Sequence, residues 1–520
     1  MLKKVLIMML AGLVSAGAIG AELMEPIAAN VFSDNMVLQR RAAVPVWGWT
    51  APGAKVTVTF KGQSVSAVAG IDGKWMLKLA PMEADSAGAE MEIKTATAKR
   101  VIKNILVGEV WLCSGQSNMQ FSLGEMPEGK ALVAAAEHPL IRLLTLSRGT
   151  ADIPVNDIEV KDQWQICTPK NTAKFSAIGY FFGTALAGKL DVPIGLIDNS
   201  RGGTCAEAWT SRAGIAAAQS LQAIFDRHLK LMEKDAFDKR VVQWQNDVAT
   251  WKSLPAEERA KWPVVVKWWK KIRPPYGYPG NPDAPAWLFN ALVNPLIPFA
   301  MKGVIWYQGE SNVPLGKEYA KLFPALIKDW RTRWGQGNFP FYFVQIVPCR
   351  EFVEFNLPDL WMSQYKTAQT VANCGMVSPM DIGDLEDPHP RRKEPVGQRL
   401  AALALAEAYG QTGIAYKSPA FKEARVEGDK IRVFFSDVSA QGLVARDGKP
   451  LSWFEIAGAD GKFHPATAVI DKDTVVVTGA DVKTPGAVRF SWNNLAEPNL
   501  SDKNGLPVLP FSSEESGRAE

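Results

Sequence analysis

Between about residues 107 and 417 the chain alternates short apolar runs with segments of helical periodicity. The apolar runs are ILVGEVWLCSG, IRLLTL, VPIGLIDNS, GVIWYQG and FPFYFVQIV. Helical patterns lie around residues 131–137, in FSAIGYFFGTALAGKL and near residues 398–409. Short apolar runs that alternate with helices are what a parallel sheet covered on both faces requires. The pattern therefore predicts an α/β domain of three layers.

Two β-rich segments flank this domain. Over residues 22–106, short strand-like runs such as KVTVTF alternate with turn residues, and strand patterns return after residue 418 in KIRVFFSD, TVVVTGA and AVRFSW. We expect a β-sandwich-like unit in each segment, at 22–106 and 418–520. A charged stretch at about 212–283 contains the helical patterns LQAIFDRHLKLMEKD and DKRVVQWQNDVATWK. We interpret it as a helical insertion into the α/β domain, in which the KWWKK run packs its Trp residues, with a sugar-facing aromatic patch as the alternative.

The amino terminus has the pattern of a secretory signal peptide. Lys3 and Lys4 precede an apolar run, and small residues follow up to Ala21. The run is too short for a spanning helix, which needs about 20 apolar residues, and no other segment approaches that length. We therefore expect residues 1–21 to be removed, the protein to be exported to the periplasm or the medium, and no membrane span to remain.

Charge and composition argue against nucleic acid and metal as partners. The chain has 58 Lys and Arg against 54 Asp and Glu, and its basic residues form no long block. Its five cysteines are too few and too scattered for a disulfide scaffold. The four histidines stand far apart, so we predict no metal site of the usual spacing. No oligomeric state follows from these features.

Ser117 lies where an α/β sheet exposes reactive groups. In GEVWLCSGQSNM it follows an apolar strand pattern, precedes a helical segment and stands two residues after Gly115, which permits a tight turn. Ligands of open α/β sheets collect at the carboxyl ends of strands, where a helix N-terminus helps to stabilise an oxyanion. Ser117 is therefore a candidate nucleophile, and a helix N-cap is its alternative role.

His389 has the sequence context expected of a base for this nucleophile. It lies in the polar loop DIGDLEDPHPRRK after the apolar run GMVSP. A carboxylate just before such a histidine can fix the imidazole tautomer and stabilise the imidazolium. His138, His228 and His464 stand in turns or on the predicted insertion, and we interpret them as surface or packing residues.

Two further strand ends combine small residues with amide side chains. DNSRGGTCAEAW follows VPIGLI, and YQGESN follows GVI. Gly202 and Gly203 would let a backbone N–H approach a tetrahedral intermediate, and Gln308 or Asn312 would offer a side-chain amide. A helix-capping turn is the alternative for either stretch alone. Three strand ends that carry Ser, Gly and amide, followed by a late His, favour a hydrolase site.

Together these residues resemble the SGNH hydrolases, and within them the sialate O-acetylesterase and related carbohydrate acetylesterase group. The matching motifs are VWLCSGQSNM, SRGGTCAEAW, WYQGESN and DPHPRRK, with KDWRTRWG and FPFYFVQI between them. FSDNMVLQR and GLPVLPF extend the similarity to nearly the whole chain. The resemblance implies a flavodoxin-like, three-layer SGNH domain and a serine esterase that removes acetyl groups from carbohydrates, with no metal or organic cofactor.

The resemblance also implies a role for each matching residue. Ser117 would be the nucleophile and His389 the base. The acid of the triad would be Asp387, two residues before the histidine, with Glu386 as the alternative. The implied oxyanion donors are the N–H groups of Ser117 and Gly203 and the amide of Gln308. The candidate substrate-binding residues are Gln116, Arg201, Glu310 and Asn312.

The expected substrate is 9-O-acetyl sialic acid, and acetyl-xylan or another acetylated glycan is the alternative. Polar, Trp-rich loops favour a sugar over the acyl chain of a lipase or thioesterase substrate, although the SGNH fold hosts both activities. We interpret Trp111, Trp209 and Trp306 as core residues, with stacking on sugar rings as the alternative. A carbohydrate-binding protein with an inactive α/β domain is the rival of another class, and the intact Ser117 and His389 count against it.

Overall fold

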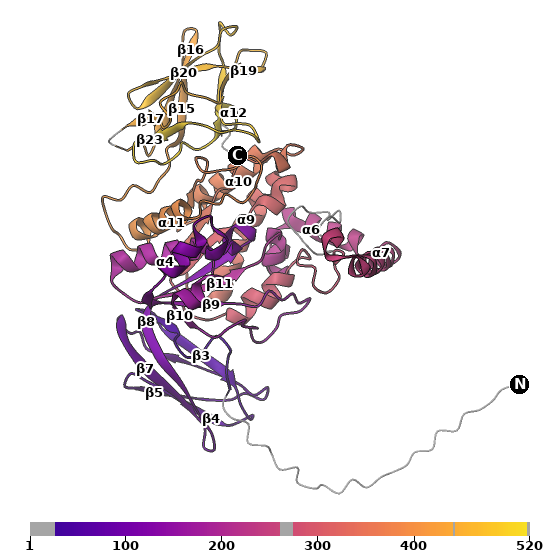
Figure 1. Ribbon diagram of the computed structural model, residues 1–520, viewed down its shortest axis with the longest axis vertical. Helices are drawn as coiled ribbons and strands as arrows, with labels where there is room; N and C mark the ends of the chain where they lie inside the picture. Colours follow the sequence, from indigo (N-terminus) through magenta and orange to yellow (C-terminus); the bar gives the residue numbers. More distant parts are fainter. Residues whose placement is uncertain (1–26, 260–273, 440–441, 517–520) are drawn as a thin grey trace, which may run out of the picture.

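The computed structural model describes residues 27–259, 274–439 and 442–516, which form a β-rich part, an α/β part and a second β-rich part along the long axis of the molecule (Figure 1). The signal peptide expected at residues 1–21 and the KWWKK run lie outside the described residues. None of the helices that are described is long and apolar enough to cross a membrane.

The middle part is built on a mostly parallel sheet, which confirms the predicted α/β architecture. Its strand order is β10-β9-β11-β8-β12-β13-β14. The strands are β8 (Lys99–Gly115), β9 (His138–Thr145), β10 (Gln165–Cys167), β11 (Ile194–Ser200), β12 (Gly303–Tyr307), β13 (Phe341–Val344) and β14 (Cys374–Val377). Neighbours from β9 to β14 are parallel, and β10 at the edge is antiparallel to β9. Every residue of β11, β12 and β13 is buried, so these strands appear as continuous apolar runs in the sequence.

Helices cover both faces of this sheet. The long ones are α4 (Ala177–Leu190), α9 (Gly316–Trp334), α10 (Leu357–Thr370) and α11 (Glu394–Glu407). Trp111 of β8 meets Phe182 of α4 edge to face, with ring centroids 5.0 Å apart. Trp306 of β12 is paired with Ser114 of β8 and contacts Trp330 of α9, with centroids 5.8 Å apart. Side chains three positions apart on a strand face opposite sides, so α4 and α9 lie on opposite faces of the sheet.

Strand β8 belongs to two sheets. Its first half pairs with β2 and β7 of the amino-terminal part, and its second half pairs with β11 and β12. The amino-terminal strands are β1 (Ile27–Ala28), β2 (Val37–Gln39), β3 (Val44–Trp49), β4 (Lys55–Phe60), β5 (Gln63–Val68), β6 (Lys74–Leu79) and β7 (Asp85–Lys94). Buried residues from Ala28 to Leu405 form one hydrophobic core. The boundary expected at residue 106 therefore falls inside a strand and inside a shared core.

The carboxyl-terminal part has a core of its own. Its sheets have the strand orders β15-β16-β21-β20, β19-β18-β22-β24 and β17-β23. The strands are β15 (Ala420–Glu427), β16 (Lys430–Ser436), β17 (Leu443–Ala445), β18 (Phe454–Ala457), β19 (Phe463–Pro465), β20 (Thr467–Asp471), β21 (Thr474–Thr478), β22 (Ala487–Phe490), β23 (Leu500–Asp502) and β24 (Phe511–Ser512). Alternate residues of β16 and β21 are buried, and Val433, Val477 and Phe490 belong to this second core.

Both segments predicted as helices of the insertion are helical. They correspond to α6 (Gln222–Leu231) and α7 (Lys234–Ser253), and α7 projects from the α/β part (Figure 1). The other helices and helical turns are α1 (Ser117–Gln120), η1 (Leu123–Glu125), α2 (Gly129–Ala134), α3 (Pro169–Thr172), η2 (Ala206–Trp209), α5 (Arg212–Ala216), η3 (Gln219–Leu221), α8 (Ala256–Arg259), η4 (Phe289–Val293), η5 (Asn294–Leu296), η6 (Glu310–Leu315), η7 (Arg350–Phe352) and α12 (Ser513–Ser516).

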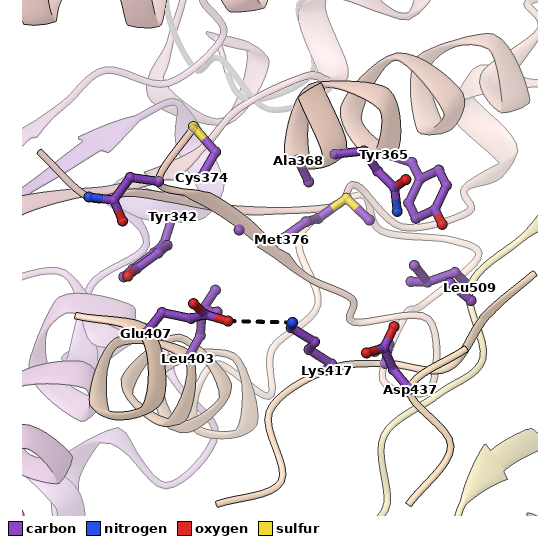
Figure 2. A pocket seen from close by; sticks show the side chains of 15 residues that line it. Tyr342, Tyr365, Ala368, Cys374, Met376, Leu403, Glu407, Lys417, Asp437 and Leu509 are labelled. Carbon is purple, nitrogen blue, oxygen red and sulfur yellow. Dashed lines mark ion pairs between the residues drawn. The ribbon is translucent and has the colours of Figure 1, made fainter. Parts of the chain in front are cut away.

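A cavity of about 260 Å³ lies where the carboxyl-terminal part meets the edge of the central sheet (Figure 2). Met376 of β14, Leu403 and Glu407 of α11, and Lys417 and Asp437 contribute to its lining. Glu407 and Lys417 form an ion pair across it at 3.5 Å (Figure 2). This cavity contains none of the site residues predicted from the sequence.

Candidate active site

Three neighbouring strands end at the same edge of the sheet, and each is followed by one of the predicted motifs. Gly115, the last residue of β8, is paired with Ser200 at the end of β11 and with Tyr307 at the end of β12. The motif after β8 therefore lies between the Gly-rich motif after β11 and the amide-containing motif after β12. This carboxyl edge is where open α/β sheets bind their ligands.

The turn that presents Ser117 depends on Gly115. Its φ is 132°, which side chains of L-residues rarely adopt, and a Cβ there would lie 2.3 Å from the carbonyl oxygen of Tyr307. The N–H of Gln116 donates to that same carbonyl at 2.8 Å. The backbone thus turns sharply out of β8, and Ser117 becomes the first residue of α1 and lines a cavity of about 610 Å³.

Ser117 and His389 are hydrogen-bonded, although 272 positions separate them in the sequence. The distance from His389 Nε2 to Ser117 Oγ is 2.7 Å. On the other side of the ring, His389 Nδ1 lies 3.0 Å from Asp387 Oδ1, and the same oxygen accepts the backbone N–H of His389 at 2.8 Å. The guanidinium of Arg391 lies 3.7 Å from Asp387 Oδ2. Hydroxyl, imidazole and carboxylate therefore form the chain of contacts that a serine hydrolase uses.

The two carboxylates proposed for the acid position have different surroundings. The side chain of Asp387 is 14% exposed and contacts the imidazole. The side chain of Glu386 is 68% exposed and pairs with Arg350 at 2.9 Å. Glu386 therefore faces solvent, and Asp387 is the carboxylate next to His389.

The surroundings of His389 favour its neutral form. Burial lowers the pKa of His389 below its ordinary value, and the positive charge of Lys393 acts in the same direction. The carboxylate of Asp387 opposes this shift without cancelling it. A neutral imidazole can accept the proton of Ser117 at neutral pH, which is the requirement for a general base.

The Gly-rich loop after β11 lies directly against Ser117. A Cβ at Gly202 would be 3.2 Å from the Cβ of Ser117, and the N–H of Gly202 donates to Gln120 Oε1 at 2.7 Å. Gly203 has a φ of 67° and lines the same cavity as Ser117. The absence of side chains at these two positions lets the loop backbone lie close to Ser117.

Gln308 and Asn312 are not among the residues that line this cavity. Gln308 is fully buried and donates its amide hydrogens to the Thr204 carbonyl at 3.0 Å and to Asn312 Oδ1 at 2.7 Å. Since an amide has two N–H donors, none remains for an oxyanion. Asn312 donates to Glu207 at 3.0 Å and is also buried. Both side chains instead join the loop after β12 to the loop after β11.

The three other candidate substrate-binding residues differ in their access to the cavity. Arg201 donates to the carbonyls of Gly149 at 3.1 Å and Gly280 at 3.0 Å, so its guanidinium holds loops together. Gln116 and Glu310 line the cavity. The Gln116 side chain nevertheless accepts two backbone N–H groups of the loop after β12 at 3.4 Å.

The sequence analysis missed a buried group beneath the His389 loop. Asn118 accepts a hydrogen bond from Lys393 and donates to Glu310 at 2.5 Å and to the Pro388 carbonyl at 2.9 Å. Asn118 directly follows Ser117, and Lys393 follows His389 by four residues. Their closeness in sequence to Ser117 and His389 is the signal by which they could have been found.

The three Trp residues near the site are core residues. Trp111, Trp209 and Trp306 are at most 1% exposed, so none can stack on a sugar ring. Trp209 and Trp306 meet edge to face with centroids 5.8 Å apart. They support the loops of the site from below.

The remaining histidines and the cysteines form no second centre in the part of the chain that the structure describes. His138 and His228 are hydrogen-bonded to tyrosine hydroxyls at 3.1 Å, and His464 lies on β19. Within residues 27–259, 274–439 and 442–516 no group of side chains could hold a metal ion, and the five cysteines are free thiols.

The chain is similar to known carbohydrate esterases. Residues 288–406 match a family described as carbohydrate esterase, sialic acid-specific acetylesterase. The chain is 30% identical to the sialate O-acetylesterase of Rattus norvegicus, an alignment that covers 89% of each protein. The chain belongs to the sialate O-acetylesterase family. The human member is 30% identical over 75% of this chain and 72% of its own length.

A solved structure supports the family assignment over the whole architecture. A carbohydrate acetylesterase from Xanthomonas citri is 31% identical, covers 94% of this chain and 99% of its own, and superimposes with a TM-score of 0.77. Membership of the sialate O-acetylesterase family makes the protein a carboxylic ester hydrolase. The segment matched by the family model carries Asp387 and His389, whereas Ser117 and Gly203 precede it.

Proposed function

We propose that this protein removes O-acetyl groups from carbohydrates, with Ser117 as nucleophile, His389 as base and Asp387 as the acid that orients it. The observation that carries the proposal is the unbroken contact from Ser117 Oγ to His389 Nε2 at 2.7 Å and from His389 Nδ1 to Asp387 at 3.0 Å. Its position at the carboxyl edge of a parallel sheet, beside a cavity of about 610 Å³, gives an ester access to the hydroxyl.

The reaction would consist of two acyl transfers. Ser117 Oγ attacks the acetyl carbonyl while His389 Nε2 takes its proton, and the imidazolium then protonates the departing sugar oxygen. A water molecule, deprotonated by His389, attacks the acetyl-enzyme and releases acetate. Asp387 stabilises the imidazolium that forms in each half.

The oxyanion would be bound by backbone groups. The N–H of Ser117 lies at the start of α1, and the N–H of Gly203 belongs to the loop that touches the nucleophile. Donors of this kind typically contribute about a hundredfold or more in rate each. Gln308 would support this loop through its hydrogen bond to Thr204.

The finer architecture follows from the same features. We infer a three-layer, flavodoxin-like SGNH domain over about residues 107–417 with an insertion at about 212–283, flanked by β-sandwich-like units. The parallel strand order and the site between β8, β11 and β12 support this inference. Export after cleavage near Ala21 would be tested by the amino-terminal sequence of the protein recovered from the periplasm and the medium.

Two substrate classes are candidates, O-acetylated sialic acid and an uncharged acetylated glycan such as acetyl-xylan. The names of the relatives favour O-acetylated sialic acid. The cavity, however, is lined by the carboxylates Glu125, Glu310, Glu351 and Asp387, with Arg391 as the cationic side chain among its lining residues. A sialic acid carries a carboxylate of its own, so acetate release from O-acetylated sialic acid and from an uncharged acetylated glycan distinguishes the two classes.

Acetate release by the purified protein tests the function and the substrate class together. The substrates are a chromogenic acetyl ester, O-acetylated sialic acid and acetyl-xylan, each with the native chain, the Ser117→Ala variant and the Ser311→Ala variant. Ser311 lines the same cavity and is exposed, so it is a matched control. We expect loss of activity with Ser117→Ala alone. Equal activity of all three proteins, or none with any acetyl ester, contradicts the proposal.

A further inference from the structure

The residue after the nucleophile holds the loop of the base at two points. Asn118 is fully buried. Its Nδ2 donates to the carbonyl of Pro388 at 2.9 Å, and its Oδ1 accepts a hydrogen bond from Lys393 Nζ. Pro388 immediately precedes His389, and Lys393 follows it by four residues. Both ends of the segment that carries the imidazole are therefore attached to one side chain.

A buried ammonium group and a half-buried carboxylate orient this amide. Lys393 is 0% exposed, and its ammonium lies 4.9 Å from the ring centroid of Phe121 and 5.8 Å from that of Tyr307. Asn118 Nδ2 also donates to Glu310 Oε1 at 2.5 Å. Oε2 of Glu310 is buried and has no hydrogen-bond partner among the described residues. Buried charges persist in proteins when they are paired and hydrogen-bonded, and here the Asn118 amide connects them.

The charges of Lys393 and Glu310 allow only one orientation of the Asn118 amide. Its oxygen must face the ammonium, which has only donors, and its nitrogen must face the carboxylate, which has only acceptors. With one N–H on Glu310, the second N–H points at Pro388. A flipped amide would place its N–H groups against Lys393 and its oxygen against Glu310, so the bond to Pro388 would be lost.

We propose that Lys393, Asn118 and Glu310 are positioning residues for the esterase reaction: the charge pair orients the Asn118 amide, and the amide sets the separation of His389 Nε2 from Ser117 Oγ. This inference rests on the proposed function of Ser117 and His389. A displacement of reacting groups by about 1 Å can cost about a hundredfold in rate, so a side chain that never touches substrate can control kcat.

The charges around the imidazole give the pair a second, electrostatic effect. Lys393 lowers the pKa of His389, whereas Asp387 and Glu351 raise it. The groups that act on Lys393 are Glu310, Asp387, Arg391 and Glu125. Burial lowers the pKa of Lys393 to about 7, and the carboxylate of Glu310 opposes that change. Loss of the Lys393 charge therefore raises the pKa of His389, and loss of the Glu310 charge makes Lys393 easier to deprotonate.

Steady-state kinetics over a range of pH test the proposal with Lys393→Met, Glu310→Gln and the double variant. For a small chromogenic acetyl ester we expect Lys393→Met to lower kcat by about a hundredfold, with KM changed by less than about threefold. The acidic limb of kcat/KM should move to higher pH. The double variant leaves neither charge unpaired, so its loss should be smaller than the product of the two single losses.

Lys302→Met is the matched control. Lys302 Nζ also lies 4.9 Å from an aromatic centroid, that of Tyr409, and it lines a different cavity. We expect its kcat to stay within about twofold of the native value, since Lys302 does not contact the His389 loop. Thermal melting of each variant shows whether it is folded. If Lys393→Met does not fold, Asn118→Asp replaces it, because it keeps the oxygen that faces Lys393 and removes the donor to Pro388.

The outcomes separate the two proposals. A folded Lys393→Met or Asn118→Asp protein with native kcat and an unchanged pH profile overturns the positioning role, and so does an equal loss in Lys302→Met. If the native protein and its Ser117→Ala variant release acetate equally, the proposed function itself fails and this inference fails with it. Loss of kcat in the variants of Lys393, Asn118 or Glu310, with a native kcat in Lys302→Met, supports both the positioning role and the proposed function.

Discussion

Replacement of Asp387 by Asn tests whether its negative charge drives the reaction. Asp387 Oδ1 accepts both the backbone N–H of His389 at 2.8 Å and its Nδ1–H at 3.0 Å. An Asn side chain of the same shape can accept both bonds through its carbonyl oxygen, or it can present its N–H groups to Nδ1 and hold the imidazole in the other tautomer. What Asp387→Asn removes is the charge that stabilises the imidazolium in both acyl transfers.

The size of the effect follows from the distance between the charges. At 3.0 Å, an effective dielectric constant of about 20 gives an attraction of about 5 kcal/mol. Arg391 lies 3.7 Å from the other carboxylate oxygen and offsets part of this attraction, and both partners are slightly exposed. A loss of about 3 to 5 kcal/mol in the transition state corresponds to about 10²- to 10⁴-fold in kcat.

Initial rates with a chromogenic acetyl ester measure kcat and KM of Asp387→Asn beside Glu386→Gln, the adjacent carboxylate. Glu386 is 68% exposed and pairs with an Arg350 side chain that is 56% exposed, so Glu386→Gln should keep kcat within about threefold. A larger loss in Glu386→Gln than in Asp387→Asn would refute the assignment of the acid. A loss of less than about tenfold in both would show that Ser117 and His389 act without a carboxylate.

Three further expectations follow from the same site. The acidic limb of kcat/KM should lie below the ordinary pKa of histidine, because burial and Lys393 lower the pKa of His389. Activity should therefore fall only as the pH drops through that lowered pKa. A limb above the ordinary value contradicts this reasoning. Gly115→Ala places a Cβ 2.3 Å from the Tyr307 carbonyl oxygen, so kcat should fall by about tenfold or more in rate assays. A native rate would show that the turn can relax. Trp306→Ala opens the core beneath the site, and denaturant unfolding should show a loss of about 3 to 5 kcal/mol if the Trp306 side chain supports the fold rather than a sugar.

The sequence alone was sufficient for the α/β architecture and for the choice of Ser117 and His389 as the proposed nucleophile and base. The continuous apolar runs of β11, β12 and β13 reflect strands that are buried on both faces, and this burial is a local property of each segment. Ser117 was recognisable because it follows a strand and a glycine, and His389 because the chain has four histidines, of which it alone follows a cluster of acids. These signals lie within a few neighbouring residues.

The tertiary structure alone decided how these residues are supported. Asp387 and Glu386 are adjacent in sequence, and the backbone of the loop determines which of them faces the imidazole. Gln308 was expected to bind an oxyanion, but its two N–H groups are donated to the Thr204 carbonyl in the loop after β11 and to Asn312 in the loop after β12. The bond network of Asn118 joins residues from three separate stretches of the chain, near positions 118, 310 and 388–393. Hydrogen-bond partners depend on which strand ends lie close together in space. Local sequence patterns do not show which strand ends these are.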